Sequence, residues 1–262
     1  MKIPHFNFGK NWDDYSTDCV NQERLDAAQQ SIKSLTGRDD LKGLSFLDVG
    51  CGSGLFSIAA AECGASKVVG IDVNPTCIDV STRNATELRP LTSEHVTEFK
   101  VGSALDEEFM SEQTEFDIVY AWGSLHHTGN MKAAIKNASL CVNRPGGMFV
   151  LAIYNKHWSS PGWTIVKRLY NVLPRFGQSF MNYTFGAIIF IAKFLVTGKS
   201  PTKKERGMDF WFDVIDWLGG YPYEYASAEE MQNKVSKLGF SCTRTTSPSA
   251  PIGCNEFVFH AS

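Results

Sequence analysis

Short apolar runs alternate with amphipathic stretches through the middle of the chain. The runs have the length of buried strands, and between them apolar residues recur at helical spacing. Such alternation predicts a parallel sheet with right-handed crossovers, which binds ligands beyond the carboxyl ends of its strands. The predicted strands are 45–49, 67–72, 97–101, 116–121 and 147–154, and the predicted helices lie near 55–63, 76–88 and 130–141.

The end of the chain extends this pattern. Ser227 and Glu230 have the spacing of a capping box, which predicts a helix that stops at Gly239. Two further strands are expected at 240–246 and 256–261. The chain therefore predicts an α/β fold that continues almost to its last residue.

The segment 157–226 departs from the rhythm and predicts a helical insertion after the fifth strand. From 156 to 206 there are nine Lys or Arg residues and one acid, whereas 207–233 hold six acids and no Lys or Arg. The basic half is also rich in aromatic residues. In it Val166, Leu169, Tyr170 and Leu173 have helical spacing, which predicts an amphipathic helix with Lys167 and Arg168 on the opposite, polar side. The basic half is read either as a substrate lid or as helices that lie in a membrane interface, with weak, salt-sensitive membrane contact through 160–200.

The first predicted strand runs into a glycine-rich turn, and a helix follows. Glycines let the backbone of such a turn approach a nucleotide-like ligand at the helix N-terminus. A dinucleotide site would need glycine at Leu55, and Asp48 would repel a pyrophosphate. A carboxylate suits a ligand with an ammonium and a sulfonium, so the turn favours S-adenosylmethionine. It reads Asp48, Val49, Gly50, Cys51, Gly52, Ser53 and Gly54.

A second acid, Asp72, ends the second predicted strand 22 residues after Gly50. A carboxylate at this point can accept hydrogen bonds from both hydroxyls of a ribose. The two acids and the glycine turn together predict one nucleoside site at the carboxyl edge of the sheet.

At this point the chain resembles the class I S-adenosylmethionine-dependent methyltransferases. The matching motifs are Leu47–Gly54, Val69–Asp72, Phe116–Val119 through Leu125–His127, and Arg144–Gly147. The resemblance implies a Rossmann-like, seven-stranded, mostly parallel sheet between helices, with S-adenosylmethionine as cofactor. It implies that the cofactor is held by Trp12, Tyr15, Asp48, Gly50, Cys51, Gly52, Gly54, Asp72, Val73, Ser103, Ala104, Ala121 and Trp122.

Four of these residues leave alternatives open. Many relatives have an acid where this chain has Ser103, so either this hydroxyl or Asp106 would accept from the adenine amine. Trp122 would pack on the adenine, close the methyl channel or belong to the core. Trp12 and Tyr15 resemble a segment that folds over the cofactor, and their helical spacing equally suits an anchor on the core.

His126 and His127 follow the fourth predicted strand, where a general base facing the transferred methyl would stand. An ordinary histidine pKa of about 6.5 suits removal of a hydroxyl proton, and predicts a rate that rises through pH 6–7. The alternative is that one imidazole caps the next helix or fills the core. His127 is favoured because Leu-x-His recurs in the ubiquinone-pathway O-methyltransferases that this region resembles.

An acidic helical face is predicted in the second half of the insertion. Asp209, Asp213 and Asp216 recur at the spacing of one helix face. They would either bind a polyhydroxylated or amine-bearing substrate or form a solvated face that balances the basic half. The cysteines and histidines have no zinc spacing, so no metal site is predicted.

Charge and composition limit the function classes. A net charge of −3 argues against a nucleic-acid partner, and seven scattered cysteines without a Cys-x-x-Cys pair indicate a reduced, cytoplasmic protein. The chain is expected to methylate a small molecule, most readily at oxygen. The alternative is a membrane-associated lipid, quinone or glycan precursor, with nucleic acid or protein less favoured.

The 262 residues are expected to form a single methyltransferase domain. Its predicted parts are an N-terminal helical cap (1–44), a cofactor-binding core (45–156), a substrate-lid insertion (157–226), and a last helix with two strands (227–262). The sequence does not predict the oligomeric state.

Overall fold

The computed structural model describes residues 6, 9, 16, 21–88, 96–113, 115–198, 210–248 and 253–262. The strands of this part of the chain form one sheet, in the order β3-β2-β1-β4-β5-β7-β6. They are β1 (Ser45–Val49), β2 (Lys67–Asp72), β3 (Val96–Val101), β4 (Ile118–Trp122), β5 (Met148–Tyr154), β6 (Phe240–Thr246) and β7 (Cys254–Ala261).

The sheet is mostly parallel. The pairs from β3 to β5 are parallel, and β7 runs antiparallel to both of its neighbours, β5 and β6. The predicted seven-stranded, mostly parallel fold is confirmed. Because the chain leaves β1 first towards β2 and later continues from β4 on the other side, the β1/β4 boundary is the switch point at which such sheets bind ligands.

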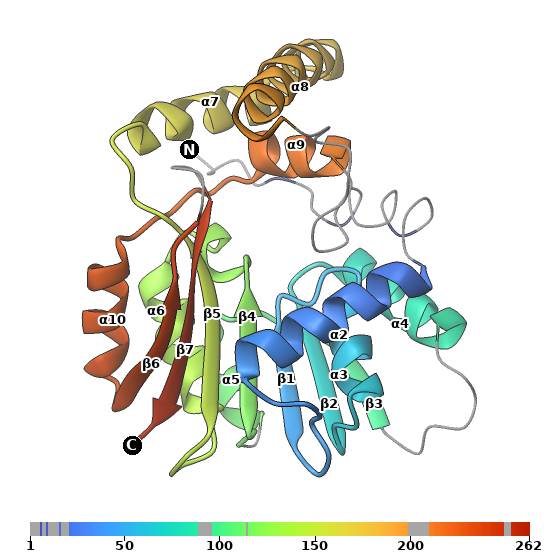
Figure 1. Ribbon diagram of the computed structural model, residues 1–262, viewed down its shortest axis with the longest axis vertical. Coiled ribbons are helices and arrows are strands. Elements are labelled where there is room, and N and C mark those ends of the chain that lie inside the picture. The colour runs from blue at the N-terminus through green and yellow to red at the C-terminus, as the bar shows by residue number, and fades with distance from the viewer. Residues whose placement is uncertain are drawn as a thin grey trace.

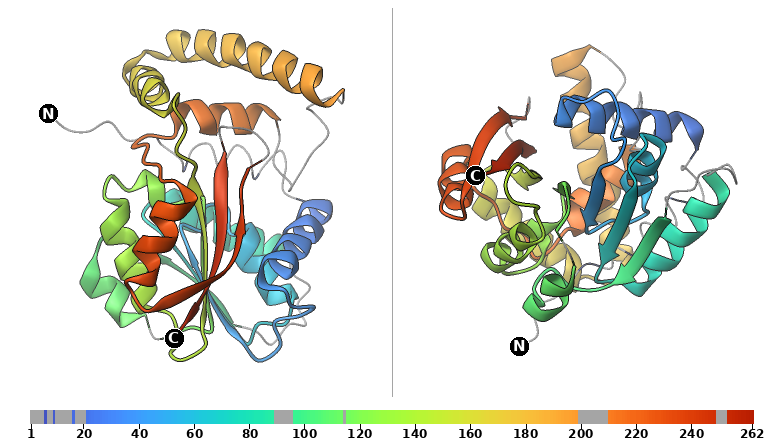
Figure 2. Two further views of the ribbon diagram at one scale, coloured as in Figure 1. Left: turned by 60° about the vertical axis from the view of Figure 1, so that its left-hand side comes forward. Right: turned by 90° about the horizontal axis from the view of Figure 1, so that it is seen from below.

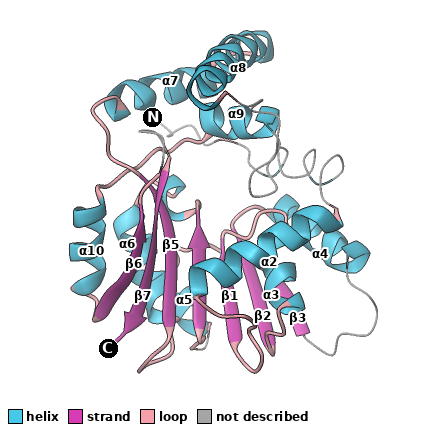
Figure 3. Ribbon diagram, in the orientation of Figure 1, coloured by secondary structure: helices cyan, strands magenta, loops and turns pink. Residues whose placement is uncertain are grey.

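Helices cover both faces of the sheet (Figures 1 and 3). Each face has its own apolar core, because side chains along a buried strand point alternately to the two faces. One layer consists of α2 (Gln22–Thr36), α3 (Leu55–Glu62) and α4 (Pro75–Leu88), and the other of α5 (Glu107–Glu112), α6 (Met131–Leu140) and α10 (Ala228–Ser236).

The insertion forms a third group of helices above the carboxyl ends of the strands (Figure 2). Its described helices are α7 (Ser160–Val172), α8 (Arg175–Thr197) and α9 (Phe210–Gly219), and α8 lies farthest from the sheet in Figure 1. A small apolar core that includes Tyr170, Phe210 and Leu218 holds them together. None of the helices in the described ranges is long and apolar enough to cross a membrane.

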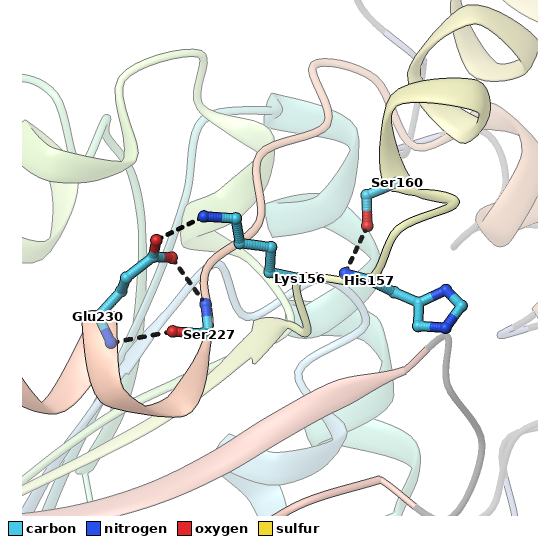
Figure 4. A network of polar contacts seen from close by, with 5 residues as sticks. All are labelled: Lys156, His157, Ser160, Ser227 and Glu230. Atoms are coloured by element: carbon cyan, nitrogen blue, oxygen red, sulfur yellow. Dashed lines mark hydrogen bonds and ion pairs between the residues drawn. The ribbon is translucent and has the colours of Figure 1, made fainter.

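The two ends of the insertion are joined where it leaves the sheet. Lys156 donates its backbone N–H to Ala226 (3.1 Å) and its ammonium to Glu230 (2.5 Å). Figure 4 shows that Glu230 also completes the predicted capping box with Ser227. The half-exposed ion pair adds little stability, so the backbone pairing and the cap, about 1 kcal/mol for the latter, define the boundary between insertion and sheet.

Candidate functional site

The glycine turn after β1 is held against the end of β2. The N–H groups of Gly50 and Cys51 both donate to the carbonyl of Ile71, at 2.7 and 3.0 Å. Gly50 has a φ of +81°, and a Cβ added there would lie 2.3 Å from the Cβ of Ser124. Ser124 is fixed in turn, since its hydroxyl donates to the carbonyl of Val49 (2.6 Å). Glycine is therefore required where the loops after β1 and β4 meet.

Asp72 connects the turn to the start of α4. Its carboxylate accepts from the N–H of Gly52 (3.1 Å) and from the N–H of Asn74 (2.8 Å). A carboxylate accepts hydrogen bonds at both oxygens, as a ribose-binding acid requires. Burial raises the pKa of this carboxyl despite these bonds. The neighbouring Val73 is 69% exposed, so an apolar side chain lies open at the same edge.

Asp48 lies behind the turn, almost completely buried. Its carboxylate accepts from the hydroxyl of Ser57 (2.7 Å), and no ion pair to it is found in the described ranges. Burial and the charge of Asp72 raise the pKa of Asp48 to about 7, although the Ser57 bond opposes this shift. A buried carboxyl without a cation fits a ligand that brings an ammonium group.

The loop after β3 lies beside this pocket edge. Gly102 donates to the carbonyl of Asp72 (2.9 Å), which fixes Ser103 and Ala104 next to it. The Ser103 hydroxyl accepts from the N–H of Leu105 (3.1 Å), whereas Asp106 caps α5. Of the two predicted adenine contacts, Asp106 therefore already has a structural role, whereas Ser103 directly follows the glycine that is hydrogen-bonded to Asp72.

Ala121 and Trp122 end β4, next to the switch point. Ala121 is completely buried in the core, and the indole of Trp122 packs against the core on the α2/α3 side. Its Nε1 donates to the carboxylate of Glu256 on β7 (2.9 Å). Because side chains alternate along a strand, Trp122 lies on the same face as Asp48.

Little of the N-terminal segment is described, and Trp12 and Tyr15 lie outside the described residues. Two described residues near them contact α4 or the residue just before it. Gly9 lies against the side chain of Asn74, and the Ser16 hydroxyl donates to Asn84 (2.5 Å). The role of the two aromatic residues stays a prediction.

His126 and His127 lie in a short 3₁₀ helix, η1 (Leu125–His127), directly after β4. His126 is completely buried, and neither of its ring nitrogens has a hydrogen-bond partner among the described residues. His127 is half-buried, and its Nδ1 lies 2.7 Å from the carbonyl oxygen of Pro222. Burial and nearby Lys167 lower the pKa of His127 to about 3, and burial also lowers that of His126.

Aromatic and basic side chains from three regions surround the two histidines. The ring of Tyr154, at the end of β5, lies 4.0 Å from His126 and 5.4 Å from His127 between ring centres. The ring centres of Trp217 and Tyr223 lie 5.2 and 5.1 Å from that of Tyr154. We call this group the Tyr154 cluster; it consists of His126, His127, Tyr154, Lys167, Trp217 and Tyr223.

The position of Lys167 corrects the sequence interpretation. Lys167 was expected on the solvated side of an amphipathic helix, yet it is fully buried in the Tyr154 cluster. Burial lowers the pKa of Lys167 to about 7, and Asp216 opposes the shift. The helix periodicity could not show this, because the rings around the ammonium come from β5, α9 and the segment after α9.

The acidic face of α9 is also only partly solvated. Asp213 is exposed, whereas Asp216 is half-buried and lies near enough to Cys77 to help raise the pKa of that thiol. Since Cys77 is in α4 beside Asp72, Asp216 lies within electrostatic range of the cofactor edge. Asp209 lies outside the described ranges.

The outward side of the insertion is unusually apolar. Trp158 is 86% exposed and Phe176 is 80% exposed. Trp158 lies just before α7, and Phe176 is on α8. Further large apolar residues exposed on these two helices are Ile165, Leu169, Val172, Phe180, Tyr183, Ile188, Ile191, Phe194 and Leu195.

The chain is similar to known methyltransferases. The chain is 31% identical over 159 residues to a ubiquinone biosynthesis O-methyltransferase of Coxiella burnetii, covering 60% of this chain and 61% of that protein. It is 33% identical over 147 residues to the protein of that name from a Methylobacterium species, covering 53% of each. The chain thus spans less than two thirds of the length of these curated relatives.

Solved structures share the fold. The magnesium protoporphyrin IX methyltransferase of Synechocystis superposes with a TM-score of 0.59, at 19% identity, over 97% of this chain and 94% of that one. The methyltransferase domain family matches residues 21–243. The chain therefore belongs to the methyltransferase domain family, as a class I member whose cofactor is S-adenosylmethionine.

Proposed function

We propose that this protein transfers the methyl group of S-adenosylmethionine to an oxygen atom of a small, planar molecule. The observation that carries the proposal is the Tyr154 cluster, which combines a half-buried histidine with aromatic rings directly after β4. The name of the Coxiella burnetii relative supports an oxygen acceptor. Rings around the site favour a planar acceptor through stacking and edge contacts.

The chain's residues have separate roles in this proposal. The turn at Gly50–Gly54 and Asp72 bind the nucleoside, and Asp48 holds the ammonium. The sulfonium of the bound cofactor supplies an electrophilic methyl group, so the protein needs mainly to align the acceptor. His127 takes the proton of the acceptor hydroxyl at Nε2, because a carbonyl oxygen next to Nδ1 requires Nδ1 to carry the hydrogen.

The acceptor atom is tested with S-adenosylmethionine labelled in its methyl group. The purified protein is incubated with a cell extract, and the labelled product is identified by mass spectrometry. A methyl ether or ester supports the proposal. Label on nitrogen, on carbon, or in protein or nucleic acid would refute it.

A second candidate is an acceptor that resides in a membrane, such as a lipid, quinone or glycan precursor. The exposed apolar residues of α7 and α8 favour it, because exposed apolar side chains that gather into a patch mark surfaces that contact a partner or a membrane. Arg168 and Arg175 are exposed beside these residues and would face anionic headgroups.

Vesicle sedimentation distinguishes the two candidates. The protein is expected to bind vesicles that contain anionic lipid at low salt, and to dissociate as salt is added. A variant in which residues 160–200 are replaced by a short linker should stay in solution, provided that it still binds S-adenosylhomocysteine. Failure of the intact protein to bind at low salt would leave a water-soluble acceptor.

Replacing Asp72 by alanine is expected to weaken S-adenosylhomocysteine binding by about 1–3 kcal/mol, the usual loss of hydrogen bonds to a charged group. Calorimetry measures the change. Asp79→Ala removes an exposed acid from the same region of α4 and should leave the affinity unchanged. Equal affinities of the Asp72 variant and the wild type would remove Asp72 from the site.

Cofactor affinity should depend on pH through Asp48. Since the pKa of Asp48 is about 7 in the free protein, its carboxyl is largely protonated below pH 7 and must lose the proton to hold an ammonium. Affinity for S-adenosylhomocysteine is therefore expected to fall as pH decreases from 7 to 5, by at most about tenfold per unit. Asp48→Asn should bind weakly with no such slope; an equal slope in both proteins would contradict this role.

A further inference from the structure

Lys167 occupies an environment that is unusual for a lysine. Its side chain has no exposed surface, and its Nζ lies 4.2 Å from the ring centre of Trp217, 4.9 Å from that of Tyr223 and 5.4 Å from that of Tyr154. Aromatic faces attract an ammonium, but they do not replace the hydrogen bonds that its N–H groups make in water.

The hydrogen bonding around Lys167 is incomplete. The ammonium has three N–H groups and donates to the carbonyl of Trp217, its one hydrogen bond among the described residues. In the same cluster, Trp217 Nε1 and both ring nitrogens of His126 are buried without a hydrogen-bond partner among the described residues. Buried donors of this kind are normally satisfied. This cluster therefore lacks a hydrogen-bond acceptor for its buried N–H groups.

The unsatisfied donors of Lys167 lie close to the expected position of the methyl acceptor. Tyr154, which contacts both histidines, also lies under the Lys167 ammonium. The Tyr154 cluster follows directly on β4 and β5, next to the Ser124 contact with the cofactor turn. An acceptor aligned with His127 would therefore lie close to Lys167.

We propose that Lys167 determines substrate specificity by binding an ionised oxygen on the methyl acceptor, an aromatic molecule with an acidic hydroxyl or a carboxylate next to the oxygen that is methylated. This inference rests on the proposed function. The oxyanion accepts from the unsatisfied donors and neutralises the buried ammonium. Burial lowers the pKa of Lys167 to about 7 although Asp216 opposes the shift, and an anion beside Lys167 would favour its charged form further.

A purely structural role for Lys167 is the competing explanation. Asn171, one turn further along α7, donates to the carbonyl of Gly219 (2.7 Å), so both residues hold the last turn of α9. A glutamine at 167 can donate to the same carbonyl but carries no charge. Lys167→Gln therefore separates the two roles, and Lys167→Met removes both.

The test uses 4-nitrophenol, whose anion is yellow and whose neutral form is not. At mildly acidic pH, with S-adenosylhomocysteine bound, the wild type should bind the probe and produce the absorption of the anion. Lys167→Gln should weaken this binding about tenfold or more, the scale of a lost charge-assisted hydrogen bond. Arg168→Gln, which changes the adjacent exposed cation, should change it less than about twofold.

Three controls make the result decisive. Nitrobenzene has the same shape without the acidic oxygen, and its affinity should be similar in wild type and Lys167→Gln. S-adenosylhomocysteine affinity reports that each variant is folded, and 4-nitrobenzoate shows whether a carboxylate is accepted as well. Absence of the anion band in the wild type, or an equal band in Lys167→Gln, would overturn the inference. Because no methyl transfer is measured, failure here is distinct from failure of the proposed O-methylation.

Discussion

Replacing Gly50 by alanine is expected to abolish cofactor binding and to lower the free energy of unfolding by about 2–5 kcal/mol. The residue has a φ of +81°, where a side chain costs about 1–2 kcal/mol. The added Cβ would also lie 2.3 Å from Ser124 Cβ, too close for two carbon atoms. The turn would have to move away from β4, and its N–H groups would leave the ligand. Denaturant titration and calorimetry with S-adenosylhomocysteine measure the two effects.

Gly123 provides a matched control on the opposite side of the same junction. Its φ is +78°, but a Cβ there would meet no atom within 4 Å. Gly123→Ala should therefore cost only the backbone strain, about 1–2 kcal/mol, and keep cofactor binding. Adding Ser124→Gly to Gly50→Ala should recover the steric part of the loss. Equal effects of the two alanine variants would show that close packing against Ser124 is unimportant.

The sheet and its cofactor edge are predictable from the sequence because their signals are local. A few adjacent residues determine each of these signals: the apolar strand pattern, the glycine turn and the acid at the end of β2. The structure brings Asp48, Gly50 and Asp72 together for the reason that the sequence argument used, since parallel strands end at the same edge.

The acceptor side of the site is much less predictable. The Tyr154 cluster combines residues from β5, η1, α7 and the region of α9, and no sequence pattern indicates that these segments meet. Lys167 is the clearest example. Helical periodicity predicts that it faces solvent, but three rings from distant parts of the sequence bury it. The only sign in the sequence was a lysine within an aromatic stretch. Lysines whose ammonium groups stay in water also occur in such stretches, so the sign does not indicate burial.

The structure also changes the expected role of the histidines in the pH dependence. An ordinary imidazole would give a rate that rises through pH 6–7. Because the pKa of His127 is about 3, the ring is already neutral throughout the physiological range, and its own ionisation should produce no rise there. An anion bound at Lys167 would neutralise the cation that helps to lower this pKa, which favours proton transfer to His127 only when substrate is bound.

Replacing His127 by alanine is accordingly expected to lower turnover about 100-fold or more, the usual contribution of a general base, while cofactor affinity stays nearly unchanged. His127→Asn is the sharper variant. Its amide N–H can still donate to the carbonyl of Pro222, as Nδ1 does at 2.7 Å, but it has no group in place of Nε2. If Nε2 is the base, both variants should lose activity to a similar extent, measured at saturating substrate.

His126→Phe completes the comparison, because a phenyl ring fills the buried position beside Tyr154 without any nitrogen. This variant should keep most of the turnover if His127 is the base. A large loss in His126→Phe with full activity in His127→Ala would assign the base to His126. Recovery of activity in His127→Asn but not in His127→Ala would instead show that His127 positions the segment around Pro222, and the acceptor oxygen would then have to be ionised before it reaches the methyl group.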